Sequence, residues 1–280
     1  MTPTVLITGS SSGIGKACAQ LFVARGWNVA ATARDPTALA GWAPTTHALA
    51  LRLDVTNEET IAAAVAATTA RFASIEALVN NAGYGVFGPL EGITPEQLER
   101  QFQTNVFGVA AMIRHVLPIM RQRRQGTIIN MSSIAGRTAD PFASAYGATK
   151  FAIEGLSESL RFELKAHGVR VKLIEPGHFK TDFLTRSLHL AKHDAYEAQF
   201  ANWMAWVAQA DGDAPLPNAV ADVVFKAATD GTDRLRYPVK GRLALVLRAM
   251  IPDAVWRSLI GGGMTRPPGE RARGRPNGRR

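Results

Sequence analysis

The chain has 280 residues, of which 46% are hydrophobic and 20% are charged, so it is long and apolar enough for one large α/β domain and is not globally disordered. The formal net charge of +9 is uneven: residues 266–280 hold six Arg and one Glu, which gives +5 and leaves +4 for the rest. A single cysteine, Cys18, excludes a disulfide framework and a cysteine-based zinc site.

Short apolar runs alternate with helical segments from residue 4 to about residue 240. In chain order, we expect strands in TVLIT, WNVAATA, HALALRLDV, IEALVN, GTIINMSS and VRVKLIEPG, and an edge strand in LRYPV. Between them we expect a helix after GSSSGIG, a small helix near residue 37, NEETIAAAVAATTARF, a long helix from about Pro95 to Gln122, and the helix that begins SAYGATK. NAGYGVFGPLEGIT reads as a loop. This alternation predicts a three-layer, doubly wound parallel sheet of the Rossmann-like α/β class.

The alternation breaks after the sixth strand, where residues 178–215 are helical in tendency and rich in aromatic side chains. Ligands bind beyond the carboxyl ends of parallel strands, so this insertion predicts a substrate lid. An alternative is that its aromatic side chains belong to the core; they are Phe179, Phe183, Tyr196, Phe200, Trp203 and Trp206. We expect residues 1–262 to form one domain and residues 263–280 to form a basic, disordered tail.

The glycine-rich segment TGSSSGIG joins the first strand to the first helix, which is where a dinucleotide pyrophosphate binds. Gly9 permits a tight turn, Gly13 lets the backbone approach the phosphates, and Gly15 allows close packing of the helix. The alternative is a glycine-rich turn without a ligand. The predicted cofactor contacts of this segment are Gly9, Ser11, Ser12, Gly13, Ile14 and Gly15.

The second strand ends in ATARDP, at the position that discriminates between NAD and NADP. Arg34 comes first, and a guanidinium suits the 2′-phosphate of NADP. Asp35 follows one step later, and a shift by one residue would favour NAD instead. We therefore expect NADP(H) as the cofactor, with NAD(H) as the alternative.

Tyr146 and Lys150 are four residues apart, which places them on one face of a helix. A cation about 4 Å from a phenol contributes up to about 4 kcal/mol, or about three pKa units, to the phenolate. The pair is thus a candidate acid/base. The alternative is a surface helix with a solvated lysine.

The motifs TGSSSGIG, LDV, NNAG, TNVFG, MSSIAG, YGATK and EPG follow one another in this order. Together they resemble the short-chain dehydrogenase/reductase family in its single-domain form. The resemblance covers residues 4–181 at motif level and extends more loosely to about residue 240. It implies hydride transfer between a nicotinamide cofactor and a carbonyl or alcohol.

By this resemblance, Tyr146 is the general acid/base, and Lys150 lowers its pKa and binds the nicotinamide ribose. Ser133 binds the substrate oxygen, and Asn105 holds a water that links Lys150 to solvent. Ser132 is expected to face away from the site and to be structural. The resemblance adds cofactor contacts from LDV, NNAG and PGHFKT: Asp54, Val55, Asn81, Ala82, Gly83, Pro176, Gly177 and Thr181.

The predicted function is an NADP(H)-dependent oxidoreductase of bulky apolar substrates, such as steroid-like, retinoid-like or fatty aldehydes and ketones. The apolar preference rests on the inserted segment, which includes Phe183, Leu184, Leu188 and Met204. One alternative is a nucleotide-sensing regulatory protein without turnover, and another is a reductase of small polar substrates.

No signal peptide precedes TVLITG, and the most apolar C-terminal stretch carries charges, so we expect a cytoplasmic protein. That stretch, KGRLALVLRAMIPDAVWRSLI, and the basic tail also suggest weak contact with an anionic membrane surface. We expect a homo-oligomer and no specific nucleic-acid partner. We expect no metal, because His189 and His193 have no third ligand arranged with them.

Overall fold

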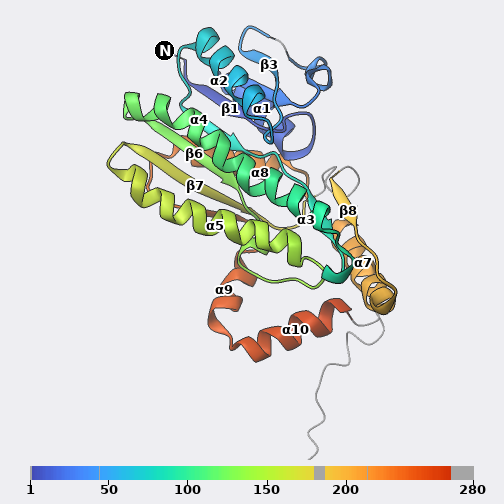
Figure 1. The fold of residues 1–280 in the computed structure, drawn as a ribbon. Helices are drawn as coiled ribbons and strands as arrows, with labels where there is room; N and C mark the ends of the chain where they lie inside the picture. Colours follow the sequence, from blue (N-terminus) through green and yellow to red (C-terminus); the bar gives the residue numbers. More distant parts are fainter. Residues whose placement is uncertain (1, 44, 180–186, 213, 266–280) are drawn as a thin grey trace, which may run out of the picture.

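A computed structural model describes residues 2–43, 45–179, 187–212 and 214–265 of the chain. Within these ranges, seven parallel strands form the central sheet in the order β3-β2-β1-β4-β6-β7-β9 (Figure 1). The predicted doubly wound parallel sheet, with its edge strand in LRYPV, is confirmed. The bounds are β1 (Thr4–Ile7), β2 (Asn28–Ala33), β3 (Ala48–Arg52), β4 (Ala77–Asn80), β6 (Gly126–Met131), β7 (Val169–Pro176) and β9 (Arg236–Val239).

Both faces of the sheet are covered by helices, and the alternation of side chains along each strand divides the core in two. In β1, Val5 and Ile7 lie in the core beneath α1 (Gly13–Ala24) and α8 (Asn218–Thr229). Leu6 points to the opposite core. That second core is covered by α2 (Glu58–Phe72), α4 (Gly108–Arg123) and α5 (Ser144–Lys165).

The strand order reverses between β1 and β4, because the chain builds outward from β1 in one direction and from β4 in the other. In open α/β sheets, a crevice forms at the carboxyl ends of the strands at such a reversal. The segments that leave β1, β4, β6 and β7 at these ends carry the predicted site residues. The fold therefore brings together motifs that are far apart in the sequence.

The single helix expected from Pro95 to Gln122 is interrupted, so that prediction is wrong in detail. α3 (Pro95–Phe102) leads into a π-helical turn, η3 (Gln103–Phe107), before α4 begins. The wide turn contains the buried Asn105, whose side chain is hydrogen-bonded to the backbone of Tyr84. Such π turns occur mostly at functional sites, and here the turn holds a predicted site residue.

A second prediction also needs correction, because the expected loop NAGYGVFGPLEGIT contains the strand β5 (Gly85–Phe87). It pairs in parallel with β8 (Leu188–Leu190), in the segment expected to be helical. Each strand has only three residues, too few to give a period in the sequence. The small sheet fixes the inserted segment beside the loop that follows β4.

The remaining elements lie around the crevice and toward the C-terminus. They are η1 (Pro36–Leu39), η2 (Leu90–Gly92), η4 (Ile134–Gly136), η5 (Asp194–Tyr196), α7 (Glu197–Gly212), α9 (Arg242–Met250) and α10 (Asp253–Thr265). Figure 1 shows α7 at one side of the sheet, with α9 and α10 below the body of the domain. Within the described ranges, no helix combines the length and the apolar character that a membrane crossing requires.

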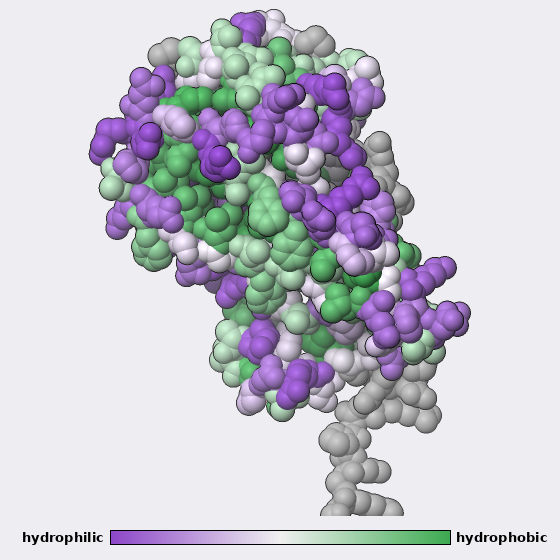
Figure 2. Space-filling model, in the orientation of Figure 1, coloured by the Kyte–Doolittle hydropathy of each residue, from purple (hydrophilic) through white to green (hydrophobic). Residues whose placement is uncertain are grey.

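Apolar side chains are exposed on the helical face formed by α4 and α5. They include Phe107 beside the start of α4 and Phe151 and Phe162 on α5. Figure 2, drawn from the same side as Figure 1, shows hydrophobic surface between the charged groups on this face. The homo-oligomer predicted from the sequence stays a prediction.

Candidate active site

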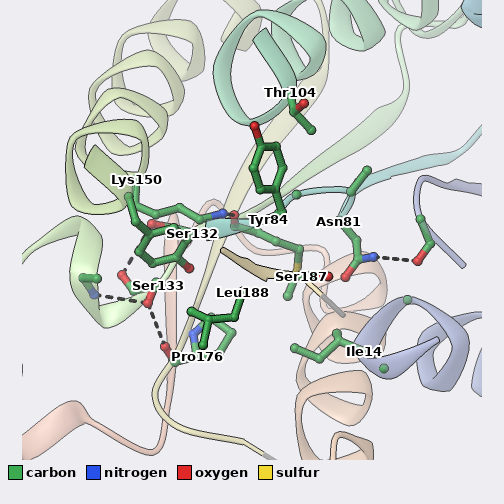
Figure 3. Close-up of a pocket in the computed structure, with 18 of the residues that line it drawn as sticks. Ile14, Asn81, Tyr84, Thr104, Ser132, Ser133, Lys150, Pro176, Ser187 and Leu188 are labelled. Atoms are coloured by element: carbon green, nitrogen blue, oxygen red, sulfur yellow. Dashed lines mark hydrogen bonds between the residues drawn. The ribbon is translucent and has the colours of Figure 1, made fainter. Parts of the chain in front are cut away.

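A cavity of about 620 Å³ lies at the carboxyl ends of the central strands (Figure 3). Of the sequence-predicted site residues, Thr181 lies outside the described residues, as do Phe183 and Leu184 of the expected lid. Asn105 does not line the cavity. The others do: Gly9, Ser11, Ser12, Gly13, Ile14, Gly15, Arg34, Asp54, Val55, Asn81, Ala82, Gly83, Ser133, Tyr146, Lys150, Pro176 and Gly177.

The cavity has two parts, which we call the cofactor half and the substrate half. The cofactor half is lined by the glycine turn of residues 9–15, Arg34, Asp54 and residues 81–83. Phe87, Asp140, His178, Phe179, Trp203 and Trp206 line the substrate half. Ser133, Tyr146 and Lys150 line the same cavity, and the Tyr146 ring contacts Phe87 of the substrate half.

Glycine is required in the turn between β1 and α1. Gly9 and Gly13 have φ angles of 71° and 53°, in the left-handed region that other residues rarely adopt. A Cβ on Gly15 would overlap the carbonyl oxygen of Gly9 and the side-chain nitrogen of Asn81. The turn therefore brings the N-terminus of α1 close to the strand ends, with its free N–H groups facing the cavity.

The NNAG motif braces this turn through hydrogen bonds. Thr8 Oγ1 accepts from the backbone N–H groups of Asn81 and Ala82, at 2.9 Å each. Asn81 Nδ2 donates to the carbonyl oxygens of Thr8, at 2.9 Å, and Gly9, at 3.0 Å. These four hydrogen bonds hold the glycine turn in its conformation.

The two residues at the end of β2 have different surroundings. Arg34 lines the cavity, whereas Asp35 does not. Asp35 Oδ1 accepts from Thr37 N, at 2.9 Å, and from Thr37 Oγ1, at 2.7 Å, which caps η1. These hydrogen bonds lower the pKa of Asp35. The Asp35 carboxylate is thus engaged in a local turn.

The cofactor half fits a nicotinamide dinucleotide. Backbone N–H groups at the start of α1 suit a pyrophosphate, and no acidic residue lies in the first turn of this helix to repel it. Asp54 lines the cavity while its Oδ1 accepts from Thr56 N, at 2.9 Å, and from Thr56 Oγ1, at 2.8 Å. The crevice at the strand reversal therefore carries a phosphate site and polar groups for the remainder of the nucleotide.

Ser133, Tyr146 and Lys150 converge from two elements. Ser133 follows β6, and its Oγ donates to Pro176 O at 3.4 Å and accepts from Ala135 N at 3.2 Å (Figure 3). Tyr146 and Lys150 lie on one face of α5. Lys150 Nζ lies 5.6 Å from the centroid of the Tyr146 ring and donates to Met131 O at 2.8 Å.

The expected lowering of the Tyr146 pKa by Lys150 is wrong for the protein on its own. Burial raises the pKa of Tyr146 to about 12; a hydrogen bond with Ser133 works against this, and the Asp140 charge adds to it. Burial lowers the pKa of Lys150 to about 8, although Glu154 opposes that change. The sequence-based estimate omitted desolvation, and desolvation dominates here.

The Asn105 side chain is hydrogen-bonded to Tyr84 and Thr149. Its Nδ2 donates to Tyr84 O, at 2.8 Å, and to Thr149 Oγ1, at 3.2 Å, and its Oδ1 accepts from Tyr84 N at 3.1 Å. It thereby ties the π-helical turn to the loop after β4 and to α5. Its predicted part in a water link to Lys150 stays a prediction.

Ser132 is buried and is part of the cavity wall. Its hydroxyl is directed toward η4, because Ser132 Oγ donates to Ser133 O at 3.5 Å and lies beside Gly136. The structural role expected for Ser132 stays a prediction.

The substrate half is built from aromatic rings. Phe87 of β5 lies 5.0 Å from Tyr146 and 5.7 Å from Trp203 between ring centroids. Trp203 stacks on Phe200 at 5.6 Å. The two interpretations of the aromatic residues both apply: Phe179, Trp203 and Trp206 line the cavity, whereas Phe200 supports it from behind. Tyr196 lies outside the cavity lining.

Sequence reasoning missed several residues that line the cavity. Tyr84 follows NNAG directly, and Arg100 of α3 lies over its ring, with 5.9 Å from the guanidinium carbon to the ring centroid. Others include Phe87, Thr104, Asp140 and His178. Adjacency to a motif could have identified Tyr84 and His178, whereas Arg100 and Asp140 carry no local signal.

The model of the family described as short chain dehydrogenase matches residues 3–190, which is more than half of the chain. The protein belongs to the short-chain dehydrogenase/reductase family. It is an oxidoreductase of this family, with the glycine turn and the Ser133–Tyr146–Lys150 cluster placed along one cavity.

Two curated proteins are similar in sequence to this short-chain dehydrogenase/reductase. The uncharacterized oxidoreductase YusZ of Bacillus subtilis is 38% identical over 272 residues, covering 91% of this chain and 96% of the relative. A 3-ketodihydrosphingosine reductase of Bacteroides thetaiotaomicron is 42% identical over 179 residues, covering 64% of this chain and 65% of the relative.

Solved structures of the family have the same fold. A short-chain dehydrogenase from Streptomyces avermitilis has a TM-score of 0.80 at 33% identity, covering 92% of this chain and 95% of that chain. A 3-ketoacyl-(acyl-carrier-protein) reductase from Brucella melitensis was solved with NADH (TM-score 0.72, 25% identity, 85% and 96% covered). A metagenomic short-chain oxidoreductase was solved with NADP (TM-score 0.65, 28% identity, 85% and 96% covered). Both cofactors therefore occur among these relatives.

Proposed function

We propose that this protein is an NADP(H)-dependent reductase of bulky, largely apolar ketones or aldehydes. The observation that carries the proposal is the position of Ser133, Tyr146 and Lys150 in one cavity. A phosphate-binding glycine turn lines one part of that cavity, and aromatic rings line the other.

A bound nicotinamide would supply the hydride that reaches the carbonyl carbon. Tyr146 then donates its phenolic proton to the carbonyl oxygen as negative charge develops there. Ser133 donates a second hydrogen bond to the same oxygen, which stabilises the developing charge. Lys150, whose Nζ donates to Met131 O and lies 5.6 Å from the centroid of the Tyr146 ring, would bind the sugar next to the nicotinamide.

Burial raises the pKa of Tyr146 to about 12, which keeps the phenol protonated at neutral pH. This is the form that donates a proton to a nascent alkoxide.

The preference for NADP(H) rests on Arg34. Arg34 directly follows β2 and lines the cavity, whereas Asp35 accepts hydrogen bonds from Thr37 and does not line it. A charge-assisted bond to a phosphate contributes about 1.5–3 kcal/mol, or roughly ten- to a hundred-fold in affinity. A ribose without the phosphate would leave this arginine without its anionic partner.

Titration of the wild type and of Arg34→Asp with NADPH and NADH, followed by nucleotide fluorescence, tests the cofactor proposal. We expect Arg34→Asp to weaken NADPH by roughly ten- to a hundred-fold and to leave NADH equal or tighter. Arg121→Asp makes the same charge change at the end of α4 and should alter neither. A wild type that prefers NADH would contradict the proposal.

The substrate class rests on the lining of the substrate half, in which Phe87, Phe179, Trp203 and Trp206 surround the approach to Tyr146. Each buried methylene of a ligand contributes about 0.8 kcal/mol, so such a wall favours extended apolar chains. The relative named 3-ketodihydrosphingosine reductase is consistent with a keto substrate. Consumption of NADPH in the presence of a panel of ketones and aldehydes tests the class, with Tyr146→Phe as the inactive control.

A further inference from the structure

One carboxylate in the substrate half has no part in the hydride-transfer mechanism. Asp140 lies between η4 and α5, six residues before Tyr146, and lines the cavity. Its side chain is half-buried, it lines the same cavity as Tyr146, and its charge acts on the Tyr146 phenol.

Within the described ranges, the Asp140 carboxylate has no recorded ion pair or side-chain hydrogen bond. Burial alone raises its pKa to about 6, and no hydrogen bond or cation opposes that rise. The cationic side chains on the cavity wall have other surroundings: Arg34 lies at the end of β2, Arg100 over Tyr84, and Lys150 against Met131 O. At neutral pH, Asp140 is thus mostly ionised, without a charged or hydrogen-bonded partner among the residues that the structure describes.

Among the described residues that surround Asp140, none donates a hydrogen bond to its carboxylate. Ala143 follows Asp140 closely and donates its N–H to Asp140 O at 3.3 Å, which leaves the carboxylate itself unused. Phe142 turns away to pack on Phe200, with 5.2 Å between ring centroids, and Phe87 covers Tyr146. An ionised group among such side chains costs several kcal/mol unless a donor meets it.

We propose that Asp140 forms a polar subsite that binds a hydrogen-bond donor on the substrate next to the reacting carbonyl, an ammonium in preference to a hydroxyl. The inference rests on the proposed function and narrows its substrate class to ketones with an apolar chain and an α-amino or α-hydroxy group. A single polar group that fixes orientation within an apolar pocket is the usual design of a specific ligand site.

Charge favours the ammonium. A bond between a carboxylate and a cation is roughly twice as strong as one between neutral groups, and an α-ammonium also neutralises the charge that opposes ionisation of Tyr146. A hydroxyl satisfies the same lone pairs without removing the charge. The two donors therefore differ in degree, and the experiment separates them.

The binding arm needs no turnover. Calorimetry measures how tightly the wild type, in the presence of NADPH, which cannot accept a hydride from an alcohol, binds a straight-chain amino alcohol, the matching diol and the matching simple alcohol. We expect the amino alcohol to bind roughly ten- to a hundred-fold more tightly than the simple alcohol, with the diol between them. Asp140→Asn should remove most of the amino preference, and Asp140→Leu should remove both preferences.

The kinetic arm compares kcat/KM for a ketone, its α-hydroxy derivative and its α-amino derivative, matched in chain length. For the wild type we expect kcat/KM to be highest for the α-amino ketone, intermediate for the α-hydroxy ketone and lowest for the unsubstituted ketone. Asp140→Asn should remove most of the preference for the amino derivative, and Asp140→Leu should remove both preferences. Asp140→Leu should improve the unsubstituted ketone. Binding of NADPH to both variants should stay within about two-fold of the wild type, which shows that the fold and the cofactor half are intact.

The outcomes distinguish this subsite from the proposed function. Reduction of plain ketones without any preference for the amino or hydroxy derivatives overturns the subsite and leaves the reductase proposal standing. Amino alcohol binding that depends on Asp140, without reduction of any ketone, supports the subsite and contradicts the reductase. Equal affinities in the wild type and in both variants overturn the subsite whatever the activity.

Discussion

The cofactor half and the substrate half of the cavity are built in different ways. The cofactor half is made of strand ends and one tight turn, held by hydrogen bonds such as those from the backbone N–H groups of Asn81 and Ala82 to the Thr8 hydroxyl. The substrate half is made of aromatic rings from β5, α7 and the segments beside them, which contact one another across long sequence distances. The shape of the cofactor half is fixed by its backbone, whereas the shape of the substrate half changes with each side chain that lines it.

This difference indicates which property of the enzyme each half controls. Backbone N–H groups and glycine turns suit a constant ligand such as a dinucleotide. Side chains from separate elements suit a ligand that varies from one family member to another. We therefore expect changes in the cofactor half to act on every substrate alike, and changes in the substrate half to act selectively.

The largest expected effect lies between the two halves, at Tyr146. Tyr146→Phe removes the proton donor and leaves the ring against Phe87, so kcat should fall by roughly 10²–10⁴-fold while the NADPH dissociation constant changes by no more than a few fold. Steady-state kinetics and cofactor fluorescence measure the two quantities. Tyr196→Phe removes a hydroxyl outside the cavity lining and should keep wild-type rates. A near-normal kcat in Tyr146→Phe would show that the acid/base is another group.

Gly15→Ala tests the rigidity of the cofactor half. The new Cβ must displace Gly9 O or Asn81, so NADPH affinity should drop by roughly ten-fold or more and stability by about 1–3 kcal/mol. The loss should be equal for short and long ketones. Gly155→Ala, on α5 with open space around its Cβ position, is the matched control. A loss of activity confined to one class of ketone would contradict the expectation that the cofactor half acts on every substrate alike.

Trp203→Ala tests the selectivity of the substrate half. Removal of this ring from the cavity wall should lower kcat/KM for the longest apolar ketones by roughly ten-fold and leave NADPH binding unchanged. Trp27→Ala removes an indole that packs against Phe22 of α1, away from the cavity. It should reduce stability without altering the order of substrates. A uniform loss for all ketones in Trp203→Ala would count against a selective role.

A further effect, on stability alone, concerns Glu175, which precedes the cavity residues Pro176 and Gly177. Its carboxylate is fully buried, its nearest cations are Arg236, at 3.5 Å, and Arg137, at 3.7 Å, and burial raises its pKa to about 7. Because the folded-state pKa lies above the ordinary glutamate value of 4.5, the contribution to stability is present at low pH and is lost as pH rises through about 7.

Glu175→Gln should therefore gain stability relative to the wild type between pH 4.5 and pH 7, by roughly 3 kcal/mol at most. Denaturant unfolding at several pH values measures this difference. Glu163→Gln, an exposed position on α5, shows the effect of losing one charge at the surface. A stability difference that is constant with pH would show that Glu175 does not titrate in this range.

Much of the fold could be predicted from the sequence, because apolar runs and glycine turns are local signals. The same holds for the residues of the cofactor half and for Ser133, Tyr146 and Lys150, which lie at strand ends or at fixed helical spacing. The π-helical turn at Asn105 could not be predicted, since the helical pattern is continuous there and only the hydrogen bonds to Tyr84 mark the break.

Other features depend on tertiary packing alone. The pKa of Tyr146 is set by burial, which a pairwise estimate with Lys150 leaves out. Trp203 and Phe200 are equally aromatic in the sequence, and only their packing places one in the cavity wall and the other behind it. Asp140 lies outside the family motifs, so nothing near it in the sequence indicates that it lines the cavity.

The most direct test of the central claim is kcat/KM with NADPH along a homologous series of ketones of increasing chain length. The claim is that Tyr146 delivers a proton within an aromatic pocket that selects extended apolar substrates. It predicts that kcat/KM rises by up to about four-fold for each added methylene until the substrate half is filled, and that Tyr146→Phe removes this activity. A kcat/KM that stays flat or falls as the chain lengthens would contradict the claim.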